Sequence, residues 1–162
     1  MKKIIKIASI ILVICGLLCL CTACGKGRVE TNVSFTYTVE TGDKIEIKLN
    51  TTDGYGFKSE LPFSITKENN TISQGTFITE DGYRQYKSLI SLGTEQGITV
   101  IEPETTKDGL TYIFYTVNGS SGVEYNYVIM VDGSKTGLLI GSLASQEQAR
   151  DVFEHLTISI VE

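Results

Sequence analysis

All four cysteines of this 162-residue chain lie before residue 25, at Cys15, Cys19, Cys21 and Cys24. Residues 25–162 therefore cannot form a disulfide among themselves. Many small exported domains use disulfides to compensate for a limited hydrophobic core. Here the folded part has to be stabilised by burial of apolar surface alone, which a domain of this length can do because it buries roughly two-thirds of its unfolded surface.

The amino end has the layout of an export signal. Lys2, Lys3 and Lys6 precede an apolar run over residues 7–23 that carries no charge and ends in two small residues. A positive start followed by such a run is typical of a signal peptide. The run is also close to the minimum length of a membrane span, so an uncleaved anchor is one alternative and ordinary secretion is another.

The segment Thr22-Ala23-Cys24-Gly25 resembles the lipobox of bacterial lipoproteins, with Cys21 where leucine is usual. The resemblance implies that residues 1–23 are a lipoprotein signal peptide, and that Cys24 is diacylated and becomes the first residue. Two acyl chains suffice for stable anchoring, because each buried methylene contributes about 0.8 kcal/mol. We therefore expect the protein at the extracytoplasmic face of a bacterial membrane, with Cys24 as its lipid anchor.

The remaining chain is predicted to be one acidic domain behind a short tether. Residues 24–31 are interpreted as the lipidated cysteine and a polar linker, and residues 32–162 as a single extracytoplasmic domain. Three of the fourteen Lys and Arg precede Cys24, which leaves eleven against nineteen Asp and Glu and a net charge of −8. Such a surface argues against nucleic acid as a partner.

Strand patterns dominate the predicted domain. Val33, Phe35, Tyr37 and Val39 alternate with polar residues, which indicates a strand with one buried face. Further strands are predicted over residues 45–49, 63–66, 71–78, 111–117, 123–131, 137–143 and 157–161. Short turn-rich segments separate them, so we expect a mainly antiparallel sheet.

Two helices are predicted to pack on this sheet. Tyr83, Tyr86 and Ile90 recur at helical spacing after an acidic segment. Ser145 and Gln148 form a capping-box pair in front of a second apolar stripe. Two helices on a mainly antiparallel sheet place the domain in the α+β class.

The strand "TGLLIGS" and the segment "SQEQARDVFEHLTISIV" resemble the carboxyl half of Mog1/PsbP-like domains. The resemblance covers about half of the folded part and implies an α/β/α sandwich. Domains of that type mostly serve as small binding or assembly factors, and none of their functional residues can be matched here. The whole chain also resembles small bacterial lipoproteins of the clostridial type.

The sequence offers little for catalysis. His155, the only histidine, falls in the last turn of the second helix, where a cation complements the helix dipole. We predict no catalytic residue, no metal site and no cofactor. An alternative function is a hydrolase that uses carboxylates such as Glu102 and Glu104 on a sugar, which requires two carboxyl groups about 5 to 10 Å apart in a cleft.

Two groups of aromatic residues are candidates for ligand binding. Tyr55 and Phe57 lie among glycines, a pattern of binding loops, although a turn that covers the core explains them as well. A second candidate platform is formed by Tyr112, Phe114, Tyr125 and Tyr127. We predict a non-catalytic module that binds an envelope protein, peptide or glycan, with a purely structural envelope protein as a further alternative.

Overall fold

The computed structural model describes residues 31–161, which belong to one compact unit. Two helices in this range are α2 (Glu80–Ser91) and α3 (Gln146–Glu154), and two short 3-10 helices are η1 (Thr52–Gly54) and η2 (Gly93–Gln96). The strands are β1 (Asn32–Thr38), β2 (Lys44–Asn50), β3 (Tyr55–Lys58), β4 (Phe63–Lys67), β5 (Asn70–Thr79), β6 (Ile98–Lys107), β7 (Leu110–Gly119), β8 (Gly122–Val131), β9 (Thr136–Ser142) and β10 (Leu156–Ile160).

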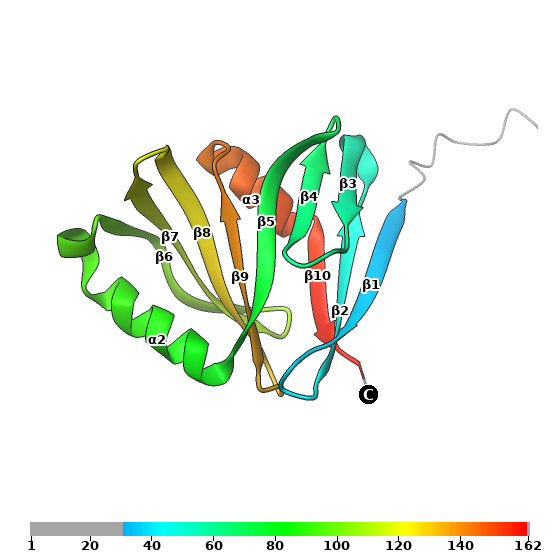
Figure 1. Ribbon diagram of the computed structural model, residues 1–162, viewed down its shortest axis with the longest axis horizontal. Coiled ribbons are helices and arrows are strands. Elements are labelled where there is room, and N and C mark those ends of the chain that lie inside the picture. Colours follow the sequence, from blue (N-terminus) through cyan, green and yellow to red (C-terminus); the bar gives the residue numbers. More distant parts are fainter. Residues whose placement is uncertain (1–30, 162) are drawn as a thin grey trace, which may run out of the picture. The chain divides into compact units, whose positions relative to one another are not determined.

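The strands form two sheets. A three-stranded sheet has the order β1-β2-β10, and a seven-stranded sheet has the order β3-β4-β5-β9-β8-β7-β6 (Figure 1). Every strand pair among residues 31–161 is antiparallel. The predicted α+β class and the mainly antiparallel pairing are therefore confirmed, with the strands divided between two sheets.

The large sheet is buried on both faces because its side chains alternate between two cores. In β7, Tyr112 and Phe114 point into a core shared with β2, β10 and α3, whereas Ile113 and Tyr115 pack against Tyr83 of α2. Figure 1 shows α2 on one side of the large sheet and α3 on the other. The strands read as nearly continuous apolar runs because neither face is left to water over most of its area.

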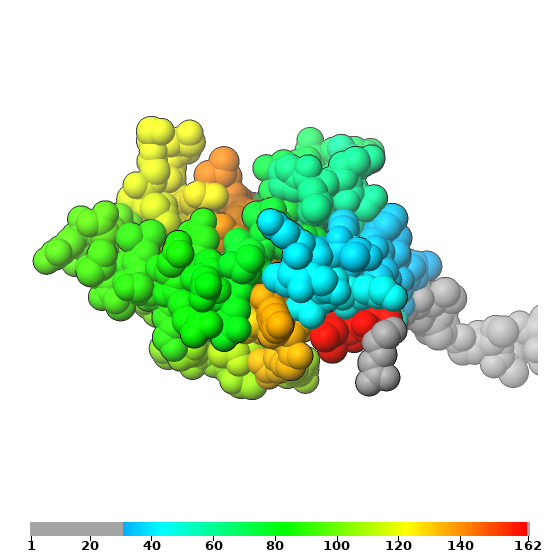
Figure 2. All heavy atoms as spheres, turned by 60° about the horizontal axis from the view of Figure 1, so that its bottom comes forward, coloured from blue at the N-terminus to red at the C-terminus, as the bar shows by residue number. Residues whose placement is uncertain are grey.

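Helix α2 covers only part of its face of the sheet. In Figure 2, α2 (green) lies across the lower strands, and a notch remains above it between the β7–β8 tip (yellow) and the ends of β4 and β5 (teal). The helix begins after Thr79, whose side chain accepts a hydrogen bond from the main-chain N–H of Gly82. Its buried residues are Tyr83 and Ile90, as the predicted stripe requires.

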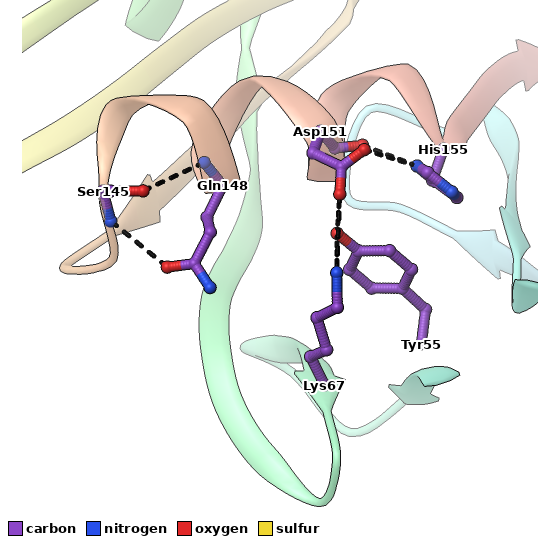
Figure 3. A network of polar contacts seen from close by, with 6 residues as sticks. All are labelled: Tyr55, Lys67, Ser145, Gln148, Asp151 and His155. Carbon is purple, nitrogen blue, oxygen red and sulfur yellow. Dashed lines mark hydrogen bonds and ion pairs between the residues drawn. The ribbon is translucent and has the colours of Figure 1, made fainter. Parts of the chain in front are cut away.

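Helix α3 has the predicted capping box. The Ser145 hydroxyl accepts from the Gln148 main-chain N–H at 3.2 Å, and the Gln148 side chain accepts from the Ser145 N–H at 3.4 Å (Figure 3). The cap fixes the start of a helix that buries Ala149 and Val152.

Replacing Ser145 with alanine is expected to lower the free energy of unfolding by about 1 kcal/mol, because the main-chain N–H of Gln148 loses its acceptor. Urea denaturation measures the change. Ser91→Ala is the control, since the Ser91 hydroxyl only donates to the Ser88 carbonyl at the exposed end of α2. A loss in Ser145→Ala no larger than in Ser91→Ala would contradict the prediction.

Strand β6 was not predicted from the sequence, because Pro103 interrupts its pattern and the pairing with β7 is irregular on either side of Glu102. Proline lacks the N–H that a central strand needs. It is tolerated in β6 because this strand is the edge of the sheet and pairs with β7 alone.

Candidate functional site

The predicted lipidation site, Cys24, lies outside the described residues, as do the predicted signal peptide (residues 1–23) and nearly all of the tether (residues 24–31). Lipid anchoring therefore stays a prediction. Among residues 31–161, no helix is long and apolar enough to cross a membrane.

Of the two interpretations of Tyr55 and Phe57, the structure favours the one in which they cover the core, and in place of an exposed loop it has a strand. Both residues belong to β3, and the Tyr55 side chain is only 5% exposed. The Phe57 ring, which is half-buried, stacks on Phe63 with 5.4 Å between centroids. The glycine between them has a packing role, because a Cβ on Gly56 would lie 2.7 Å from the Thr66 hydroxyl on the paired strand. This segment therefore serves the core, where a ligand does not reach it.

The Tyr55 hydroxyl joins a polar cluster at the side of α3 (Figure 3). It donates to the Asp151 carboxylate and accepts from Lys67 Nζ at 3.3 Å. Lys67 Nζ lies 3.6 Å from Asp151 Oδ2, and His155 Nδ1 lies 3.5 Å from Asp151 Oδ1. The cluster thus connects β3 and β4 to α3.

The protonation states in this cluster suit hydrogen bonds that hold the fold together. Burial raises the pKa of Tyr55, and its hydrogen bond to Asp151 raises it further, so the phenol stays a neutral donor. The same hydrogen bond lowers the pKa of Asp151, which stays a charged acceptor. His155 Nδ1 donates to the main-chain carbonyl of Asp151 at 2.7 Å, which fits the predicted position at the helix end. No serine or threonine hydroxyl within residues 31–161 is hydrogen-bonded to His155.

The lowered pKa of Asp151 makes this part of the fold sensitive to acid. Its stabilisation is complete above the ordinary carboxyl pKa of 3.8 and is lost as the pH falls through the lower folded-state pKa. Asp151→Asn is expected to lose about 1 kcal/mol of unfolding free energy at pH 7, a small value because the side chain is 41% exposed.

The difference in unfolding free energy between wild type and Asp151→Asn is expected to shrink below pH 3.8. Urea denaturation from pH 7 to pH 2.5 measures it, with the exposed Glu95→Gln as a charge-matched control. A difference between the two proteins that stays constant across this range would contradict the assignment.

The four-residue aromatic platform is also part of the core. Tyr112, Phe114 and Tyr127 are buried, and Tyr125 is half-buried. The Tyr127 ring stacks on Phe114 and on Phe153 of α3, each with 4.2 Å between centroids. Because α3 lies on this face of the sheet, most of the surface of these rings is used in the core.

Glu102 and Glu104 do not form a carboxylate pair. Glu102 accepts from Arg150 of α3 and from the Tyr112 hydroxyl, on one face of the large sheet. Glu104 accepts from Lys87 and Tyr83 of α2, on the opposite face. The hydrogen bond from Lys87 lowers the pKa of Glu104, whereas a general acid needs a raised pKa. These two residues therefore lack the arrangement that the hydrolase alternative requires.

A groove of about 550 Å³ lies where α2 leaves the large sheet uncovered. It corresponds to the notch in Figure 2, with the segment after β9 (orange) between the yellow and teal walls. Residues of β5, β8 and β9 line it together with Pro62, Leu143 and Ala144. The exposed rim includes Leu143, whose side chain is 66% exposed. This volume is in the range of small-molecule and side-chain binding sites.

Several polar groups in the groove lack an internal partner. Asn126 is 5% exposed, and its side chain makes no hydrogen bond within residues 31–161. The half-buried Glu124 side chain makes no hydrogen bond or ion pair in the same range. The hydroxyl of Ser73 is buried without a partner. Buried polar groups are nearly always hydrogen-bonded, and within residues 31–161 only the hydroxyls of Ser73 in the groove and Thr52 outside it are buried without a partner.

Gly141 forms the floor beneath two of these groups. It pairs with Asn126 of β8 on one side and with Gln74 of β5 on the other. A Cβ at Gly141 would lie 2.7 Å from Glu124 Oε1 and 2.9 Å from Asn126 Oδ1. The two oxygens therefore converge over the space that the missing side chain leaves.

The groove was not predicted from the sequence. Glu124 and Asn126 fall inside a predicted strand, and the signal that points to them is an amide and a carboxylate at alternate positions in an otherwise apolar run. Within residues 31–161, no group of three His, Cys, Asp or Glu residues is placed to hold a metal ion. Comparison with known protein families finds none that matches the chain. A search of curated proteins finds no relative.

Proposed function

We propose that this chain is a bacterial lipoprotein, anchored through Cys24, whose folded part is a non-catalytic module that binds an envelope protein, peptide or glycan. The observation that carries the binding role is the groove over Gly141, where Glu124 and Asn126 have no partner of their own. A ligand that donates to these two oxygens would form hydrogen bonds at a place where residues 31–161 supply no donor.

The anchor and the location rest on the sequence. The positive start, the apolar run of residues 7–23 and Thr22-Ala23-Cys24-Gly25 support export followed by lipidation. The short polar segment before β1 gives the domain some reach from the membrane surface. We extend the proposal to the fold type, because a helix on each face of a mainly antiparallel sheet is what the Mog1/PsbP-like resemblance implies.

Groove-dependent capture of an envelope component tests the binding role. Solubilised envelope fractions are passed over residues 25–162, with Thr76→Trp to fill the groove and Thr36→Trp as the control. Thr76 is exposed and lines the groove, whereas Thr36 is exposed on β1 away from it. We expect a component that binds the unaltered domain and Thr36→Trp but not Thr76→Trp.

Two outcomes would count against the binding role. One is that no envelope component binds the unaltered domain. The other is that Thr76→Trp and Thr36→Trp capture the same components to the same extent, which would place any binding surface elsewhere.

A further inference from the structure

We infer that the groove recognises a primary ammonium group on an alkyl chain, as in a lysine side chain of a peptide or protein. The ammonium would sit over Gly141 between Glu124 Oε1 and Asn126 Oδ1. This inference rests on the proposed binding function and names the chemistry that the site selects.

The charge of the groove determines the sign of the charge that the ligand carries. Glu124 is the only charged residue that lines it, and neither Lys nor Arg is among the lining residues. Two other half-buried carboxylates in the described structure have a cation beside them, since Glu102 has Arg150 and Asp151 has Lys67. Glu124 faces the groove without such a cation among residues 31–161, so a cationic ligand would give it the partner that those two carboxylates have.

The geometry favours a compact cation with several donors. An ammonium group has three N–H donors, and two acceptors already converge at this point. Asn126 contributes an amide oxygen that makes no hydrogen bond within residues 31–161 and lines the groove. Gly141 leaves the space in which the cation would lie, because any side chain there would displace both oxygens.

The rest of the lining favours an alkyl stem over a sugar ring. Ile72, Leu139 and Leu143 supply apolar surface along which the methylenes of a lysine side chain can pack. None of the residues that line the groove is aromatic, and two tyrosines, Tyr86 and Tyr115, line a neighbouring depression. An amino sugar would satisfy the two oxygens but would leave this apolar surface uncovered.

Titration calorimetry with the full-length protein in detergent micelles tests the inference. The probes are the peptide acetyl-Ala-Lys-Ala-amide, the same peptide with norleucine in place of lysine, and glucosamine. Norleucine keeps an apolar stem without the ammonium group. We expect the lysine peptide to bind, the norleucine peptide to bind at least tenfold more weakly, and glucosamine to bind more weakly than the lysine peptide.

Two variants test whether the lysine peptide binds in the groove. Glu124→Gln should weaken binding of the lysine peptide about 10-fold to 100-fold, since the oxygen that accepts from the ammonium group loses its negative charge. Gly141→Ala should weaken it about tenfold by turning both oxygens aside, while the fold is kept because the neighbours are flexible side-chain ends. Glu95→Gln removes an equal charge outside the groove and should leave the affinity unchanged within about twofold.

The inference is overturned if the lysine peptide does not bind at millimolar concentration, if the norleucine peptide binds equally well, or if Glu124→Gln has no effect in a protein that melts like the wild type. Tighter binding of glucosamine would replace the lysine side chain by an amino sugar and would equally overturn it. If Thr76→Trp still abolishes envelope capture in any of these cases, the proposed binding function stands without this chemistry.

Discussion

Phe63→Ala is expected to lower the free energy of unfolding by about 3 to 5 kcal/mol, the range for deleting a buried phenylalanine ring. Phe63 is fully buried, and its ring lies 5.4 Å from that of Phe57, 6.3 Å from that of Phe77 and 6.4 Å from that of Tyr37. It thus connects the large sheet to β1 of the small sheet. A disulfide would stabilise the fold by restricting the unfolded chain, but residues 25–162 contain none. The loss of packing is therefore not offset in this way.

Urea denaturation followed by circular dichroism measures the effect. Phe35→Ala is the matched control, because Phe35 is half-buried on the edge strand β1 and stacks on one ring, Phe57, at 5.2 Å. We expect Phe35→Ala to cost less than half as much. A loss in Phe63→Ala that does not exceed the loss in Phe35→Ala would show that the contact between the sheets is not a major source of stability.

Gly75→Ala is expected to cost about 1 to 3 kcal/mol through overpacking against the same ring. Gly75 pairs directly with Phe63 across β4 and β5. An added Cβ would lie 2.1 Å from Phe63 Cζ and 2.6 Å from Cε2. The fully buried ring has no free space into which to withdraw, so the strands have to separate or the ring has to leave its preferred conformation.

A double-mutant cycle identifies this clash as the cause. Phe63→Leu removes the ring atoms that meet the new methyl group, so Gly75→Ala should cost much less in a Phe63→Leu background. Gly109→Ala is a useful contrast, because its Cβ would meet no neighbouring atom and any loss there reflects its positive φ of 78°. If the costs of Gly75→Ala and Phe63→Leu simply add, the clash with Phe63 is not responsible.

Local signals in the sequence were sufficient to predict much of the fold. The alternation in β1 and β2, the runs of β-branched and aromatic residues in β7 and β8, and the capping box of Ser145 each depend on residues close together in the chain. The same holds for the apolar stripe of α2. By contrast, β3 is a strand because it pairs with β4, and its Gly-Tyr-Gly sequence indicates a loop when considered alone. Pro103 similarly conceals β6, which owes its pairing to its place at the sheet edge.

The candidate site was harder to predict, for physical reasons. The aromatic residues that suggested ligand binding are used by the core, because α3 and the small sheet cover the face on which they lie. The groove depends on the lateral order β5-β9-β8, which brings Gln74, Gly141 and Asn126 side by side although they are distant in sequence. No local pattern encodes that order. The usable signal was the pair of polar residues at alternate positions, Glu124 and Asn126, in an otherwise apolar strand.

Intact mass spectrometry of the membrane-associated protein tests the central claim, that the module is held at the membrane by a lipid on Cys24. The wild type is compared with Cys24→Ala and with Cys19→Ala, which removes a cysteine from the apolar run as a control. We expect that wild type and Cys19→Ala begin at a diacylated Cys24, and that Cys24→Ala carries no lipid and keeps residues 1–23. If the wild type also keeps residues 1–23 without a lipid, the protein is held by an uncleaved apolar segment and the lipoprotein proposal is wrong.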